Sequence, residues 1–114
     1  MDSYRVGMKL IVAIVRESDC NRLIDVLVSR SYAATKLSSS GGFLRRGNST
    51  LLIGVEGEEV EDVISIIREN CRSHVETIVP PSFVPTHGFT SSPIEVRVGG
   101  AVVFVLDIER FEKT

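Results

Sequence analysis

The sequence predicts one α+β domain over residues 1–114, in which an antiparallel sheet carries two helices on one face. Two observations lead to this prediction. The apolar pattern divides the chain into strand, helix, strand, strand, helix, strand and strand. The length of 114 residues suffices for one sizeable core. This order is the split β-α-β, ferredoxin-like plan, βαββαβ, with an extra C-terminal strand.

The first strand and the first helix lie in the N-terminal third of the chain. Residues 1–7 show no period and are expected to form a flexible extension. Met8 to Val15, MKLIVAIV, is almost continuously apolar and β-branched, which is typical of a central strand or of a strand at an oligomer interface. Ser18 offers an N-cap oxygen for a helix from about Asp19 to Arg30, whose apolar residues recur on one face.

Tyr32 to Gly54 is expected to be the ligand-binding element. Tyr32 to Leu37 and Thr50 to Val55 have strand composition, and the turn between them is SSSGGFLRRGNS. Backbone N–H groups, hydroxyls, guanidinium charge and one aromatic ring together suit a nucleotide-like anion better than a core. One of Arg45 and Arg46 is a candidate anion contact, and a solvated charge pair is the alternative.

The second half of the chain contains a helix followed by segments of strand composition. A helix with an acidic first turn follows Gly57. Val75 to Val79 and Ile94 to Val98 have the composition of strands, and Ala101 to Leu106 is a fully apolar strand. The prolines of residues 80–93 exclude regular structure, and a loop of that length favours a functional or partner-covering role.

Composition narrows the class of protein. The 13 basic and 15 acidic residues give a formal net charge of -2, and no basic stripe favours nucleic acid. No apolar run matches a membrane span or a secretory signal, which predicts a soluble, cytoplasmic protein. Cys20 and Cys71 lack CxxC spacing and are expected to be reduced and partly buried. His74 and His87 are too far apart to suggest a metal site.

The sheet face opposite the helices has nothing in the chain to cover it, although the outer strands are apolar in both phases. A homo-oligomer with its sheets packed together is the simplest solution.

Two stretches, YAATKLSSSGGFLRRGNST and VRVGGAVVFVLDIERF, resemble the PII-like cyclic di-AMP receptor proteins of bacteria. The similarity covers about Met8 to Phe111, and its pattern xATKLxxxGGFLRxGN is far more specific than a glycine-rich turn. The resemblance implies a homotrimer that binds cyclic di-AMP in clefts between subunits and signals to an effector protein, with no enzyme activity and no cofactor. It implies ligand contacts from Thr35, Gly42, Phe43, Leu44, Asn48, Gly54 and Phe104.

The residues themselves leave alternatives open. Without the motif, Phe43 fits a subunit interface equally well, and Thr35 and Asn48 fit ordinary hairpin chemistry. A small phosphatase on the same plan would need a glycine-rich cradle beside Arg16, and VRESD has none.

Three positions depart from the family pattern. Ligand-binding relatives usually carry asparagine and arginine where this chain has Ser31 and Ala33, and glutamine at the position of Lys113. Loss of the arginine removes a charge-assisted hydrogen bond worth about 1.5–3 kcal/mol. The ligand then binds weakly, or Arg45 and Arg46 compensate, or the ligand differs. The alternative function is a degenerate member that binds another nucleotide or serves only protein interaction.

Overall fold

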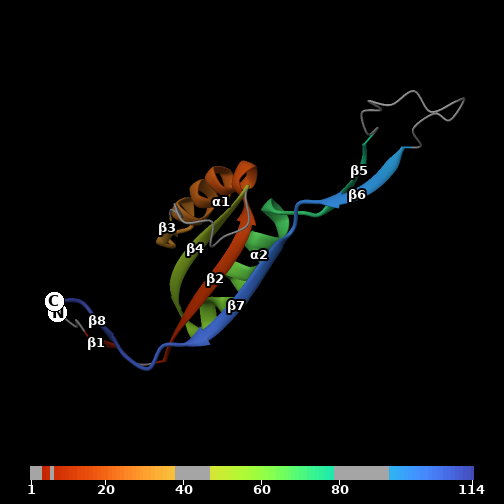
Figure 1. Cartoon of the computed structure of the whole chain (residues 1–114). Helices are drawn as coiled ribbons and strands as arrows, with labels where there is room; N and C mark the ends of the chain where they lie inside the picture. Colours follow the sequence, from red (N-terminus) through yellow and green to blue (C-terminus); the bar gives the residue numbers. More distant parts are fainter. Residues whose placement is uncertain (1–3, 6, 38–46, 79–92) are drawn as a thin grey trace, which may run out of the picture.

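The computed structural model describes residues 4–5, 7–37, 47–78 and 93–114. Its centre is a four-stranded antiparallel sheet in the order β3-β4-β2-β7. The strands are β2 (Met8–Arg16), β3 (Ala34–Leu37), β4 (Asn48–Glu56) and β7 (Ala101–Asp107). The helices are α1 (Glu17–Ser29) and α2 (Val60–Asn70), the second preceded by the 3-10 turn η1 (Gly57–Glu59). This order and connectivity are those of the predicted ferredoxin-like plan (Figure 1).

The core lies between the sheet and the two helices. Alternate residues of β2 and β4 point toward the helices, because successive strand side chains face opposite sides of a sheet. Each helix contributes one apolar face, and both cysteines are buried and free, as predicted. The core residues are Ile11, Ala13, Val15, Cys20, Leu23, Leu27, Leu51, Ile53, Val55, Val63, Ile66, Ile67 and Cys71.

Helix α1 begins earlier than the sequence suggested. It starts at Glu17 directly after β2, so the prediction of Ser18 as N-cap is wrong. The N-cap residue is Arg16, which makes no side-chain capping hydrogen bond. The Glu17 N–H instead donates to the Gly47 carbonyl oxygen at 2.8 Å. The carbonyl of a neighbouring turn therefore accepts a hydrogen bond from one of the first N–H groups of the helix, which have no partner within it.

The prediction of a single sheet with an extra C-terminal strand is also wrong. β5 (His74–Ile78) and β6 (Ile94–Val98) pair with each other in a separate two-stranded sheet, which projects from the main body (Figure 1). The edge strand beside β2 is β7, which pairs with β2 along its whole length from Ala101 to Asp107. In that position Val103 of β7 packs against the core.

A third pair of strands joins the two ends of the chain. β1 (Tyr4–Arg5) is antiparallel to β8 (Phe111–Glu112), and the sequence pattern predicted neither strand. The flexibility of residues 1–7 stays a prediction.

The β5–β6 hairpin joins the main body through a close backbone contact. Gly99 and Gly100 have φ angles of +82° and +84°. A Cβ atom on Gly99 would lie 2.7 Å from the carbonyl oxygen of Arg72. Only glycine permits both this backbone conformation and this close approach to the Arg72 carbonyl. The glycine pair therefore allows the base of the hairpin to pack against the end of α2.

Candidate functional site

The sheet face turned away from the helices is open and apolar. Val102, Phe104 and Leu106 of β7 are 47–53% exposed on this face. Their neighbours Val12 and Leu10 on β2 are half-buried. A contiguous apolar surface of this kind marks a site for a partner, because water contact with it is unfavourable. The expectation of an uncovered sheet face is therefore confirmed for the single chain.

One row of residues crosses this open face from edge to edge. Thr35 of β3 pairs with Leu52 of β4, and Leu52 pairs with Val12 of β2. Val12 pairs in turn with Phe104 of β7. Three strand spacings separate Thr35 from Phe104, about 14 Å. Two predicted site residues therefore share a face and a row but lie at opposite edges of the sheet.

Thr35 and Gly54 form the first part of the candidate site. Gly54 lies two residues beyond Leu52 on the same face, so it is the diagonal neighbour of Thr35, about 7 Å away. It is exposed, and a Cβ atom there would meet Met8 Cε at 3.9 Å. Continuing the register of β3 by one residue places Ala33 beside Gly54. A ligand can therefore approach the backbone here closely.

Asn48 lies at the other end of β4. It pairs with Arg16, and six residues along the strand separate it from Gly54, about 20 Å. Asn48 and Arg16 line a hollow of about 370 Å³ together with Gly99 and Gly100. The described part of the chain therefore does not bring Asn48 to the Thr35 and Gly54 pair.

The remaining predicted contacts lie outside the described residues. They are Gly42, Phe43, Leu44 and Arg45, and Arg46 lies there too. Their contacts with a ligand stay predictions.

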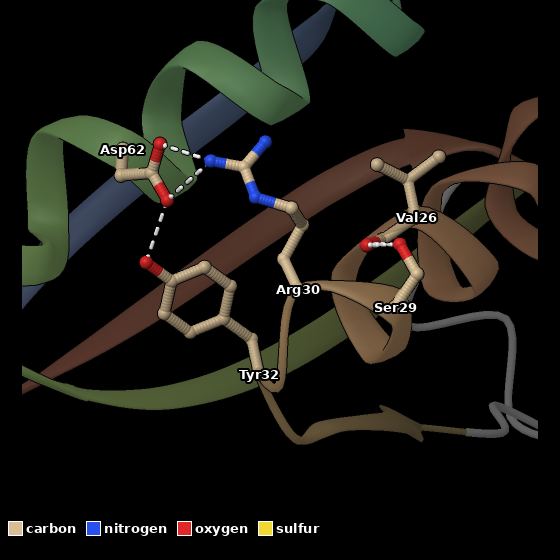
Figure 2. A network of polar contacts seen from close by, with 5 residues as sticks. All are labelled: Val26, Ser29, Arg30, Tyr32 and Asp62. Carbon is tan, nitrogen blue, oxygen red and sulfur yellow. Dashed lines mark hydrogen bonds and ion pairs between the residues drawn. The ribbon is translucent and has the colours of Figure 1, made fainter.

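The segment that leads into β3 is held by a polar network (Figure 2). Arg30 Nη2 donates to both carboxylate oxygens of Asp62 at 2.9 and 3.1 Å, and Tyr32 Oη donates to Asp62 Oδ2 at 2.6 Å. The hydrogen bond to this carboxylate, with burial and its charge, raises the pKa of Tyr32. A carboxylate of α2 thus fixes the start of the strand that carries Thr35.

Ser31 adopts a left-handed conformation between α1 and β3, with a φ angle of +67°. The Tyr32 N–H donates to the Leu27 carbonyl at 2.9 Å, and the Ser31 N–H donates to the Val28 carbonyl at 3.0 Å. These two bonds form a Schellman motif, which favours glycine or asparagine at the position of Ser31. The departure at Ser31 therefore has a conformational consequence at the helix end.

The sequence pattern does not indicate two further polar residues near the candidate site. Arg16 suggested only a phosphatase cradle, and no sequence signal places it beside Asn48. Thr50 is 5% exposed, and its Oγ1 has no hydrogen-bond partner among the described residues. Threonine is common in strands, so nothing in the pattern distinguishes it.

The described ranges contain no group of three histidine, cysteine, aspartate or glutamate side chains arranged to hold a metal ion. Within the same ranges, no helix is both long and apolar enough to cross a membrane.

Comparison with known proteins gives two results. A family model described as a cyclic-di-AMP receptor matches residues 8–114. The chain also resembles a crystal structure of a functionally unknown protein from Pediococcus pentosaceus ATCC 25745, with 39% sequence identity and a TM-score of 0.71. That match covers 96% of this chain and 100% of the other.

Proposed function

The chain belongs to the cyclic-di-AMP receptor family, and from this premise we propose that it is a cytoplasmic PII-like signal transducer that binds cyclic di-AMP between the subunits of a homotrimer. The observation that carries the proposal is the separation of Thr35 on one edge strand, with Gly54 on the strand beside it, from Phe104 on the opposite edge strand of the same sheet.

A ligand that touched both edges of one chain would have to lie across the apolar row through Leu52 and Val12. That position would desolvate its phosphates against groups that cannot donate hydrogen bonds, which is costly. A second subunit removes the difficulty when its β7 edge lies beside the β3 edge of the first. Phe104 of one subunit then faces Thr35 and Gly54 of the next, and its ring can stack on a base.

The proposed contact joins two different edges of the sheet, β3 and β7. Such a heterologous contact closes into a ring when its rotation allows, whereas a two-fold dimer requires each surface patch to meet itself. The ring also covers the open apolar face of every subunit, including Val102 and Leu106. A trimer therefore accounts for the ligand site and for the apolar face together.

The proposed role is binding and not catalysis. Thr35 supplies a hydrogen-bonding group, Gly54 supplies accessible backbone and Phe104 supplies an aromatic surface. These groups recognise a nucleotide without moving a proton at neutral pH. An effector protein would then detect the liganded state of the trimer.

The test mixes two weakened variants. Thr35→Arg blocks the β3 edge and Phe104→Ala removes the aromatic ring, so each protein alone is expected to bind cyclic di-AMP much more weakly than the unmodified protein in calorimetry. After subunit exchange at equal amounts, random assembly restores about a quarter of the sites, because an intact β3 edge then meets an intact β7 edge.

Light scattering on the same samples gives the oligomeric state. Absence of any restored site after proven subunit exchange would place both residues in the site of one chain and refute the shared cleft. No heat from the unmodified protein at high micromolar cyclic di-AMP would remove that ligand.

The second candidate function is that of a degenerate family member which binds another nucleotide or serves only protein interaction. Ala33 favours it, because this position lies beside Gly54 and carries no charge.

A further inference from the structure

A second hollow lies on the helix side of the sheet, away from the open face. This groove of about 520 Å³ runs between the end of α2 and β7, at the base of the β5–β6 hairpin. Ile64, Ile67 and Val103 provide apolar lining, and Arg68, Arg72 and Ser73 provide polar lining, with Cys71, Gly100 and Ala101 completing it. Its volume lies within the range of small-molecule sites, about 300–1,000 Å³.

Two guanidinium groups at this groove are available to a ligand. Arg68 and Arg72 are exposed, and within the described residues neither forms an ion pair or a hydrogen bond. Basic residues at the end of a helix ordinarily offset the negative end of its dipole. Here Arg22 Nη2 from α1 already donates to the Asn70 carbonyl at 2.6 Å. Arg68 and Arg72 are therefore not needed for that carbonyl.

Ser73 supplies a third polar group with a defined role. Its Oγ accepts a hydrogen bond from Arg97 Nη1 at 3.1 Å, which leaves its own proton to donate elsewhere. The contact between Gly99 and the Arg72 carbonyl fixes the backbone beside Ser73. The Cys71 thiol at this groove is neutral, because burial raises its pKa to about 11. No thiolate therefore opposes an anion at neutral pH.

We propose that this groove binds a small organic phosphate. The phosphate lies between the guanidinium groups of Arg68 and Arg72 and accepts a hydrogen bond from the Ser73 hydroxyl. The apolar body of the ligand packs on the side chains of Ile64 and Val103. Guanidinium groups match phosphate oxygens in geometry and charge, which favours phosphate over a neutral ligand. The site is separate from the cleft proposed for cyclic di-AMP.

The experiment titrates phenyl phosphate into the ¹⁵N-labelled full chain and follows the arginine Nε–Hε signals and the Ser73 and Gly100 amides by NMR. Saturable shifts at these groups are expected. Arg68→Gln with Arg72→Gln is expected to weaken binding about tenfold or more, since two charge-assisted contacts are lost. Inorganic phosphate, which lacks the ring, is expected to bind several-fold more weakly than phenyl phosphate.

Arg110→Gln is the matched control, because it removes one exposed guanidinium from the C-terminal tail, remote in sequence from the groove. Ser73→Ala provides a second variant that preserves the net charge. The site is supported if both groove variants weaken phenyl phosphate binding while Arg110→Gln does not. It is refuted by equal weakening in all three proteins, by shifts centred elsewhere, or by no saturation at millimolar ligand. Unchanged cyclic di-AMP binding in the double variant would separate this site from the proposed cleft.

Discussion

Thr35 and Phe104 lie on the same face and in the same row of the four-stranded sheet, yet they occupy its two opposite edges. In the proposed assembly, this arrangement would give each chain two different half-sites and no complete one. A ring of chains would join the half-sites, because the β3 edge of each subunit would meet the β7 edge of the next. Ligand binding would thereby report on the assembled state.

Replacing Phe104 with alanine is expected to weaken cyclic di-AMP binding about tenfold to a hundredfold, since stacking of one base on an aromatic ring contributes about 1–3 kcal/mol. Val102→Ala is the matched control on the same strand and face. Calorimetry gives the dissociation constants, and light scattering shows whether assembly persists. Equal losses in the two variants at constant assembly would contradict a direct contact by Phe104.

Introducing arginine at Ala33 is expected to strengthen cyclic di-AMP binding by about one to two decades, the effect of one charge-assisted hydrogen bond. The register places this position beside Gly54, which has no side chain of its own, and a Cβ atom built on Gly54 meets only Met8 Cε at 3.9 Å among the described residues. Ser29→Arg adds the same charge on the exposed end of α1 and serves as control. An equal gain in the control would show a general charge effect and not a repaired site.

Replacing Ser31 with glycine is expected to stabilise the fold by about 0.5–1 kcal/mol, because glycine adopts the left-handed conformation without a steric penalty. Ser31→Ala keeps that penalty and should give no gain. Chemical denaturation at one fixed protein concentration measures the difference. A loss of stability in Ser31→Gly would indicate that the serine side chain itself has a structural role.

Gly99 and Gly47 form a matched pair for alanine substitution, with φ angles of +82° and +87°. The Cβ atom added in Gly47→Ala has no neighbour within 4 Å. This substitution is therefore expected to lower the free energy of unfolding only by the conformational penalty, about 1 kcal/mol. Gly99→Ala adds the clash with the Arg72 carbonyl and should cost about 1–3 kcal/mol more. Denaturation curves compare the variants, and equal costs would show that the hairpin base can shift freely.

The titration of Tyr32 tests the network around Asp62. In a Tyr4→Phe background, the phenol is expected to titrate above its ordinary pKa of 10.0, because it donates to the Asp62 carboxylate. Asp62→Asn should lower the pKa toward that ordinary value, whereas Asp25→Asn should not. Ultraviolet absorbance of the phenolate provides the measurement.

The same raised pKa sets the direction of a stability change. Folding favours the neutral phenol, so its contribution is complete below about pH 10 and is lost as the pH rises through the folded-state pKa. Asp62→Asn should therefore lose less stability than the unmodified protein over this alkaline range. An identical alkaline decline in both proteins would show that the network does not couple Tyr32 to folding.

Sequence periodicity predicted the elements better than their ends or their pairing. Ile94–Val98 is strand β6 as expected, whereas α1 begins at Glu17 without the expected Ser18 cap. The Glu17 N–H donates to the Gly47 carbonyl, which is distant in sequence, so local pattern could not indicate this contact at the helix start. For the site, the family resemblance predicted ligand contacts from Thr35 and Phe104, and their roles stay predictions. Their separation depends on strand order, which local pattern does not encode.

The amino-acid sequence by itself determined the α+β class, the two helical faces, the central apolar strands and membership of the family. These properties depend on local spacing and on a specific motif, both of which are readable along the chain. The tertiary structure decided which strand lies beside β2 and seated the hairpin on α2 through Gly99. It also placed Ala101 and Val103 of β7 beside Arg68 and Arg72 at the end of α2 to form one groove, because packing joins segments whose relation no local pattern specifies.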